Sequence, residues 1–224
     1  MEIASFYSHR FAKEILDSVQ PLNELWLEIE DAVLSISEEE IIATHNEIQV
    51  KESTKSLSKA INKLIDRNLK VRKWKDQSGI FGSAEYQEGK ESTWTLDFSK
   101  TCNISNARHS GIAVEVAFNH AEAAAWNLTK PVLAAEINDV RVQTNIGEGI
   151  GIVIVASPEL KKNGAFDGAI GDYQRYLKTI KAMRSQLTAP ILLIGLGAPR
   201  TFKVQAKEQK NSPYKSGEIV PLAL

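Results

Sequence analysis

"GIAVEVAFNH", the stretch from Gly111 to His120, decides the fold, because it is almost wholly apolar and carries one carboxylate, Glu115. A β-strand buried on both faces shows such a near-continuous run of alanine, valine and isoleucine. A charge inside a buried strand is costly unless it is paired or binds a metal. The stretch therefore predicts a central strand of a covered sheet, in which Glu115 has a partner.

Other apolar runs predict the neighbouring strands. Trp94 to Phe98 precedes the central strand, and the polar stretch "SKTCNISNARHSG" between them reads as a loop. Further along the chain, "IGIVIVAS" (Ile150 to Ser157) and "PILLIGLGAP" (Pro190 to Pro199) are typical of buried strands by their length and β-branching. The glycine-rich end of the second lacks the spacing of a phosphate-binding loop, so we expect no nucleotide cofactor.

Segments with apolar residues at helical spacing lie before these strands and between them. They cover Leu22 to Ile36, Ser53 to Leu69 and Ile170 to Leu187. Ser37 followed by Glu40 predicts a capping box at the start of another short helix. "HAEAAAWNL" favours a helix that Pro131 interrupts or restarts.

Strands that alternate with helices predict an α/β fold with a mixed central β-sheet flanked by helices. We expect a single domain over 1–224, with a mainly helical part at 1–75 and an α/β core at 92–198. Residues 199–224 are polar and basic and predict a mobile tail, or an arm that becomes ordered on a partner.

Composition narrows the class of protein. The formal net charge of −1 does not by itself indicate a nucleic-acid partner, although local basic patches can still bind one. Cys102 is the single cysteine, so no internal disulfide can form. The first residues lack a signal-peptide core, and no apolar run reaches the length of a membrane span. We expect a soluble cytoplasmic protein without a membrane partner.

A second carboxylate gives Glu115 a chemical context. Asp97 ends the strand that precedes the central one, and a hairpin-like pair of strands would bring the two carboxylates together. Two carboxylates that share a site need a cation, and oxygen ligands suit Mg²⁺. The pattern favours metal-dependent hydrolysis of a phosphodiester. The alternative is a buried ion pair of Glu115 with an arginine such as Arg108 or Arg141.

Several short motifs, in the same order and at similar spacing, resemble the type II restriction endonucleases of the BglII and BstYI group, with a more distant likeness to BamHI. They are "YSH" (Tyr7–His9), "LWLEIEDAVLSI" (25–36), "KESTK" (Lys51–Lys55), "KWK" (Lys73–Lys75), "AVEVAF" (Ala113–Phe118) and "APILLIGLGAP" (189–199). The likeness covers all but about the last two dozen residues. It implies a PD-(D/E)XK nuclease of a prokaryotic cytoplasm, a homodimer that uses Mg²⁺ to cut double-stranded DNA at a short palindrome.

The resemblance also implies roles for single residues. Glu115 matches the metal-binding glutamate of the family, and Asp97 in "LDFSK" best matches its metal-binding aspartate. The gap between the two is longer than in the group it resembles. An alignment without an insertion would put Asn106 at the aspartate position, but we favour Asp97 because an extra loop is easier to accommodate than a lost ligand.

The third active-site position of the family, two residues after the glutamate, is Ala117 here. Three explanations stay open. A nearby residue, Glu122 or His120, takes over the catalytic role; the attacking water is activated without a side-chain base; or the chain binds DNA and cuts it poorly.

DNA contacts are expected at two places. Asn119 and His120 follow the catalytic strand, where the family presents side chains to DNA, although Asn119 equally suits a helix N-cap. A basic run suits phosphate contacts, or else a solvated surface. This run consists of Arg67, Lys70, Arg72, Lys73 and Lys75.

Three hypotheses follow from these observations. The first is the type II restriction endonuclease, with a site centred on GATC in the relatives that it resembles. The second is a DNA-binding protein of the same fold with weak or no cleavage, because of Ala117. The third is an unrelated α/β domain in which Glu115 forms an ion pair.

Overall fold

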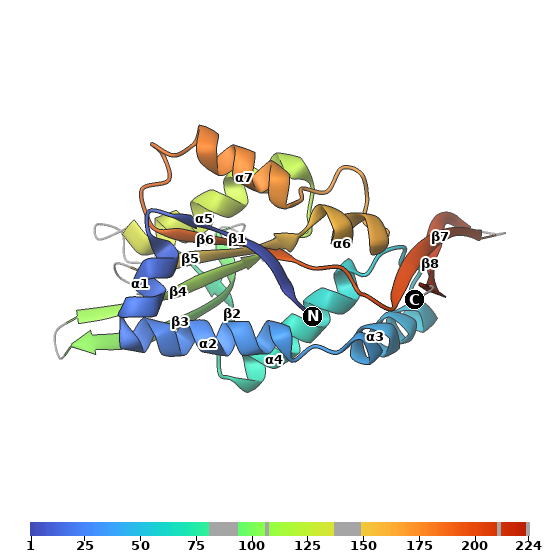
Figure 1. Cartoon of the computed structure of the whole chain (residues 1–224), viewed down its shortest axis with the longest axis horizontal. Coiled ribbons are helices and arrows are strands. Elements are labelled where there is room, and N and C mark those ends of the chain that lie inside the picture. Colours follow the sequence, from blue (N-terminus) through green and yellow to red (C-terminus); the bar gives the residue numbers. More distant parts are fainter. Residues whose placement is uncertain (81–93, 106–107, 137–148, 210–211, 223–224) are drawn as a thin grey trace.

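A six-stranded mixed sheet forms the centre of the molecule (Figure 1). The computed structural model describes residues 1–80, 94–105, 108–136, 149–209 and 212–222. The strand order of the sheet is β1-β6-β5-β4-β3-β2. The expected α/β class with a mixed, helix-flanked sheet is confirmed. The strands are β1 (Ile3–His9), β2 (Lys75–Gly79), β3 (Thr95–Ser105), β4 (Arg108–Val116), β5 (Ile150–Ala156) and β6 (Ile191–Leu196).

Strands β4, β5 and β6 are parallel to one another, whereas the pairs β1–β6, β3–β4 and β2–β3 are antiparallel. Every residue of β5 and of β6 is buried. This explains their unbroken apolar sequence, because a parallel strand with helices on both sides has no face left for polar residues.

Helices cover both faces of the sheet (Figure 1). On one face, α1 (Ala12–Ser18) packs against β1 and β6, α2 (Gln20–Leu34) against β3 and β4, and α4 (Ser58–Val71) against β2. On the other face lie α5 (Ala124–Glu136) and α7 (Tyr173–Ala182). The buried apolar residues accordingly form two clusters. The remaining helices are α3 (Glu38–Lys51), α6 (Pro158–Asn163) and the 3-10 turn η2 (Ala121–Ala123).

The N-terminal third is mainly helical, as expected, but it also supplies both edge strands of the sheet. β1 pairs with β6, and β2 pairs with β3. The capping box of Ser37 and Glu40 is confirmed, since each side chain accepts a hydrogen bond from the other residue's backbone N–H. No helix in the described ranges is long and apolar enough to cross a membrane.

The expected loop between Phe98 and Ile112 is wrong, because β3 and β4 continue through it as an antiparallel hairpin. The register pairs Cys102 with Ser110 and Asn103 with His109. Alternate exposed and half-buried positions along this part of β3 show why the segment looked polar. A strand with one solvated face needs few apolar residues.

Pro131 does not interrupt the helix, because α5 runs through it from Ala124 to Glu136. Its ring packs against β5 at Gly151, where a Cβ atom would lie 2.6 Å from the Cβ of Pro131. Gly151 therefore lets α5 approach the sheet more closely than any other residue would permit. This contact helps to set the distance between α5 and the central strands.

Replacing Gly151 by alanine is expected to destabilise the protein by about 1–3 kcal/mol, the usual effect of overpacking a core. The added methyl group meets the ring of a proline, which cannot rotate away. Thermal unfolding measures the effect as a fall in Tm of several degrees. Gly168→Ala is the matched control, since a Cβ there meets nothing within 4 Å. Equal Tm values of the two variants would contradict the prediction.

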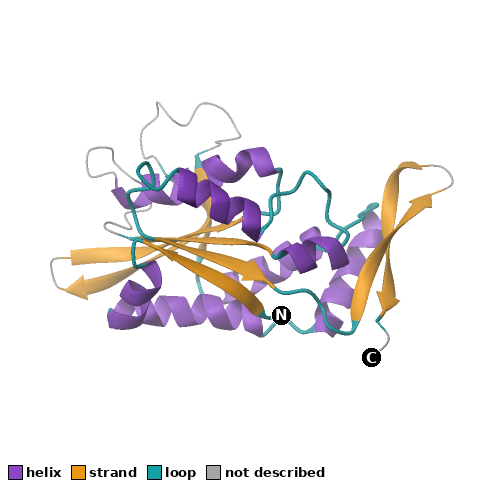
Figure 2. Cartoon of the chain, turned by 45° about the horizontal axis from the view of Figure 1, so that its top comes forward, coloured by secondary structure: helices purple, strands orange, loops and turns teal. Residues whose placement is uncertain are grey.

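The C-terminal segment forms an antiparallel hairpin of β7 (Phe202–Gln209) and β8 (Ser212–Pro221), which Figure 2 shows beside α3 and apart from the main sheet. The backbone of Gly217 donates a hydrogen bond to Thr54 O, and its carbonyl lies 3.1 Å from Nε2 of the buried His45. The expectation of a tail without structure is therefore corrected for these residues, since the hairpin docks on its own chain. Lys210, part of the basic tail, lies outside the described residues.

Candidate active site

The two predicted carboxylates meet at the point where β3 and β4 separate. The ladder between the strands ends at the pair Phe98–Val114, one position before Asp97 would face Glu115. Instead of a ladder bond, the backbone N–H of Val116 donates to Oδ2 of Asp97 over 2.7 Å. On its other side, β4 stays paired with β5, where Glu115 is opposite Val153. The side chain of Asp97 thus fills the gap that the departing strand leaves.

Both carboxylates are largely withdrawn from water. Glu115 is only 2% exposed. Burial, followed by the negative charge of Asp97, raises the pKa of Glu115 to about 8, although Lys130 acts in the opposite direction. Burial also raises the pKa of Asp97, against the Val116 N–H and the charge of Lys130. Such perturbed acids in one place mark a functional site more often than a purely structural one.

A lysine that the sequence analysis did not single out completes the group. Lys130 on α5 places its Nζ 2.5 Å from Oε2 of Glu115 and 3.1 Å from the carbonyl oxygen of Thr95 on β3. Glu115 therefore does form a buried ion pair, but with this lysine. Arg141 lies outside the described residues, as does the side chain of Arg108. No local pattern could have found Lys130, because it is 15 residues from Glu115 and belongs to a different element.

The remaining oxygen of Glu115 fits a metal ion. Oε1 is buried and has no hydrogen-bond donor among the described residues. A buried acceptor without a donor is unfavourable unless a cation or water completes it. The described residues hold no group of three or more His, Cys, Asp and Glu side chains that could bind one metal ion. Two carboxylates suffice for Mg²⁺, which keeps several waters and takes substrate oxygens as ligands.

A cavity of about 180 Å³ adjoins Asp97 on the side of α4. Asn62 and Asp66 of α4 and Gln77 of β2 form its polar wall, together with Asp97. Gln77 has a positive φ of 43°, a strained conformation that residues adopt more often near functional sites than elsewhere. The cavity gives a ligand access to Asp97 from the side opposite to α5.

The two residues proposed to replace the missing third group lie outside this cluster. His120 and Glu122 are exposed at the beginning of the η2 segment, and the structure shows neither of them in a hydrogen bond or ion pair with Asp97 or Glu115. Ala117 itself is 2% exposed and belongs to the apolar cluster under α5.

Asn119 is exposed, but its side chain is engaged within the chain. Its Oδ1 accepts a hydrogen bond from Nδ2 of the buried Asn127, which also lies 2.7 Å from the hydroxyl of Tyr176. The expectation that Asn119 caps the following helix is wrong, because the 3-10 turn begins after His120 and has no side-chain cap. Asn119 is held instead by α5.

The predicted basic run is only partly available to a ligand. Arg67 pairs with Glu40, Lys70 with Asp66 and Asp76, and Arg72 with Asp31. Lys73 and Lys75 are exposed at the turn into β2. These two side chains are therefore the better placed of the run for phosphate contacts.

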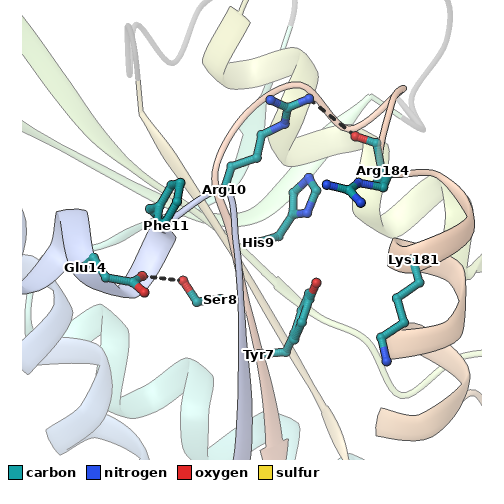
Figure 3. Close-up of a pocket in the computed structure, with 8 residues that line it drawn as sticks. All are labelled: Tyr7, Ser8, His9, Arg10, Phe11, Glu14, Lys181 and Arg184. Carbon is teal, nitrogen blue, oxygen red and sulfur yellow. Dashed lines mark hydrogen bonds between the residues drawn. The ribbon is translucent and has the colours of Figure 1, made fainter.

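A larger pocket than the one at Asp97 lies elsewhere, at the end of β1 (Figure 3). It has a volume of about 660 Å³, and Arg10, Lys181 and Arg184 contribute positive charge to its wall. His9 and Arg10 are held there by the carbonyl oxygen of Leu187, each at 2.8 Å. Among the described residues that line it, Glu14 is the single acid. This pocket lacks the pair of carboxylates that metal-assisted hydrolysis requires, so Asp97 and Glu115 stay the predicted site of the chemistry.

Two solved structures of a known protein resemble this fold. The crystal structure of the restriction endonuclease BglII complexed with a DNA 16-mer resembles the fold with a TM-score of 0.62 at 17% identity, covering 99% of this chain and 100% of that chain. Free BglII gives a TM-score of 0.51 at 14% identity, with the same coverage. No curated protein sequence matches the chain.

The sequence model of the restriction endonuclease BglII/BglIII family matches residues 4–196, which include Asp97, Glu115 and Lys130. This match overturns the hypothesis of an unrelated α/β domain. The chain belongs to the BglII/BglIII family of restriction endonucleases, which are site-specific deoxyribonucleases.

Proposed function

We propose that the chain is a type II restriction endonuclease that uses Mg²⁺ to cut both strands of DNA at a short palindromic site. The observation that carries the proposal is the meeting of Asp97 and Glu115 in the gap between β3 and β4. The crystal structure of BglII with a DNA 16-mer, which shares this fold, supports DNA as the ligand.

Asp97 and Glu115 would hold the metal, Glu115 through its unpartnered Oε1. Mg²⁺ in this place would stabilise the charge that develops on the scissile phosphate. The chain itself supplies the geometry. The Val116 N–H fixes one carboxylate through Asp97 Oδ2, and Lys130 fixes the other through Glu115 Oε2. Asp97 is held by β4 and Glu115 by α5, so both carboxylates need little reorganisation when DNA binds.

We further propose that the active form is a homodimer and that a site centred on GATC is the first to test. An isologous dimer presents the same surface to each half of a duplex, so its recognition site is palindromic. The exposed side chains of Asn119, His120, Lys73 and Lys75 are the proposed DNA contacts.

Incubating the protein with unmethylated phage DNA and Mg²⁺ is expected to give discrete bands, because cleavage is confined to one short sequence. Samples with EDTA in place of Mg²⁺ are expected to leave the DNA intact. Mapping the fragment ends then identifies the site, and sedimentation measures the oligomeric state. A smear at every protein concentration would contradict site specificity.

The buried methyl group of Ala117 favours one second candidate, a DNA-binding protein of this fold with weak or no cleavage. It predicts sequence-selective gel shifts that persist with Mg²⁺ while the DNA stays intact. Discrete double-strand cleavage would exclude it.

A further inference from the structure

The strand position two residues after Glu115 offers no chemistry. Ala117 is 2% exposed, and its methyl group belongs to the apolar cluster that includes Leu128 and Val132 of α5. A nuclease of the proposed type needs positive charge or hydrogen-bond donors where charge develops on the phosphate. Strand β4 does not supply such a group after Glu115, so another element has to supply it.

Lys130 has the geometry that this role requires. Its Nζ lies between the separating strands, in contact with Glu115 on β4 and with the Thr95 carbonyl on β3. The side chains of Lys130 and Glu115 are 11% and 3% exposed. An ammonium group has three N–H donors, and these two described oxygens accept two of them. One N–H is left, on a group that already borders both carboxylates.

We propose that Lys130 is the third active-site residue of this enzyme, replacing from α5 the group that Ala117 cannot provide. It fixes Oε2 of Glu115, leaves Oε1 for the metal, and donates its remaining N–H to a non-bridging oxygen of the scissile phosphate. The inference rests on the proposed function.

The reaction needs no change in the protonation of Lys130. A water oxygen forms a bond to phosphorus and loses one proton to solvent, the bond from phosphorus to the leaving sugar oxygen breaks, and the departing oxygen takes up a proton from solvent. Lys130 stays an ammonium group throughout and stabilises the added negative charge by its hydrogen bond. Such a donor is most effective in a site from which water is excluded.

The position of Lys130 depends on the close approach of α5 to the sheet. Pro131, the next residue, contacts Gly151 on β5. This contact holds the backbone of Lys130 near the strands, so that a single side chain reaches both Glu115 and Thr95.

A purely structural ion pair is the alternative explanation of the same contacts. Buried ion pairs are frequently replaceable without loss of function, and their loss shows in stability alone. Elsewhere in the chain, Lys100 makes comparable contacts, with its Nζ 2.6 Å from Oε2 of Glu28 and 2.8 Å from the carbonyl of Arg72. This second pair provides a matched control.

The test compares Lys130→Met, Lys130→Arg and Lys100→Met with the wild type. Three quantities are measured: the single-turnover cleavage rate with enzyme and Mg²⁺ in excess over DNA, the affinity for Mn²⁺ without DNA, and the Tm. Lys130→Met is expected to lower the rate by about 10²- to 10³-fold, the usual effect of losing one donor to a developing charge. Its Mn²⁺ affinity holds or increases, because a neighbouring positive charge is gone.

Lys130→Arg keeps the charge and the donors, so its rate should lie between those of Lys130→Met and the wild type. Lys100→Met should lose a modest amount of stability, as is usual for a partly exposed ion pair. Its cleavage rate should stay within about threefold of the wild-type rate. If Lys130→Met does not unfold cooperatively, Lys130→Gln takes its place under the same criteria.

A cleavage rate of Lys130→Met within threefold of the wild type would overturn the inference and leave a structural ion pair. So would a loss of rate that is fully explained by a loss of Mn²⁺ affinity. If the wild type cuts no DNA, the proposed function itself fails. If the wild type and Lys130→Met cut DNA at the same rate, only the role of Lys130 fails.

Discussion

Replacing Glu115 by glutamine is expected to lower the single-turnover rate of DNA cleavage by at least about a thousandfold. The change keeps the shape of the side chain but removes the negative charge that would hold the metal at Oε1. A metal ion contributes several kcal/mol to the stabilisation of phosphate charge, and each 1.4 kcal/mol corresponds to a factor of ten in rate. Binding of DNA in EDTA should stay the same or become tighter, because one negative charge near the phosphates is gone.

The same substitution should change how stability depends on pH in EDTA. The pKa of Glu115 is raised from an ordinary 4.5 to about 8 in the folded state. A raised pKa means that the folded state holds the proton more tightly, so this stabilisation is complete below about pH 4.5 and is lost as the pH rises through about 8. Wild type should thus lose on the order of a few kcal/mol between pH 5 and 9 relative to Glu115→Gln.

Glu28→Gln is the matched control for both measurements, because Glu28 also pairs with a lysine and lies away from Asp97. It should cut DNA at nearly the wild-type rate. Retained cleavage by Glu115→Gln, together with a marked loss of stability at every pH, would contradict a metal-binding role and leave the ion pair with Lys130 as the sole purpose of Glu115.

Substitutions of Asp97 should separate its charge from its structural hydrogen bond. Asp97→Asn keeps an oxygen that can accept from the Val116 N–H, so we expect a nearly unchanged Tm and a cleavage rate at least about a hundredfold lower. Asp97→Ala removes the acceptor as well. It leaves the Val116 N–H without its partner, and an additional loss of about 1–3 kcal/mol should appear in chemical unfolding.

The comparison of the two Asp97 variants decides the role of this residue. Equal stability of Asp97→Asn and Asp97→Ala would show that the hydrogen bond to Val116 contributes nothing. Cleavage by Asp97→Asn at the wild-type rate would show that the metal-binding aspartate lies elsewhere, for example in the region of Asn106, which is outside the described residues.

Local sequence patterns predicted the buried centre of the fold and one half of the site. An apolar run with one carboxylate identifies Glu115 because the cost of burying a charge is a property of its own strand. Asp97 could be predicted from the neighbouring strand, since consecutive strands commonly pair. The pattern alone left the partner of Glu115 open between a metal and an arginine. The family resemblance implies the metal, and this role stays a prediction.

The features that were missed all depend on contacts between distant parts of the chain. The sequence around Lys130 does not distinguish it from a solvent-exposed lysine of a helix. Its position follows from the packing of Pro131 on Gly151, which brings α5 close to the sheet. Most residues of β1 and β2 are exposed or half-buried, so their sequences lack the apolar signature of β5 and β6. The hairpin beyond Phe98 is polar because alternate residues of β3 are exposed there, and only its register shows that it is a strand.

The pairing of β1 with β6 has a consequence for synthesis of the protein. Ile3 is opposite Leu196 and His9 is opposite Ile191, so one edge of the sheet joins residues almost 190 positions apart. A ribosome that adds about 5–20 residues per second needs roughly 10–40 s to make the partner of β1. Until then β5 also has an unpaired apolar edge, because β6 is its second neighbour. The nascent chain therefore completes its central sheet only after Leu196 has been made, and a polypeptide released before β6 exposes the unpaired edges of β1 and β5, which can then aggregate.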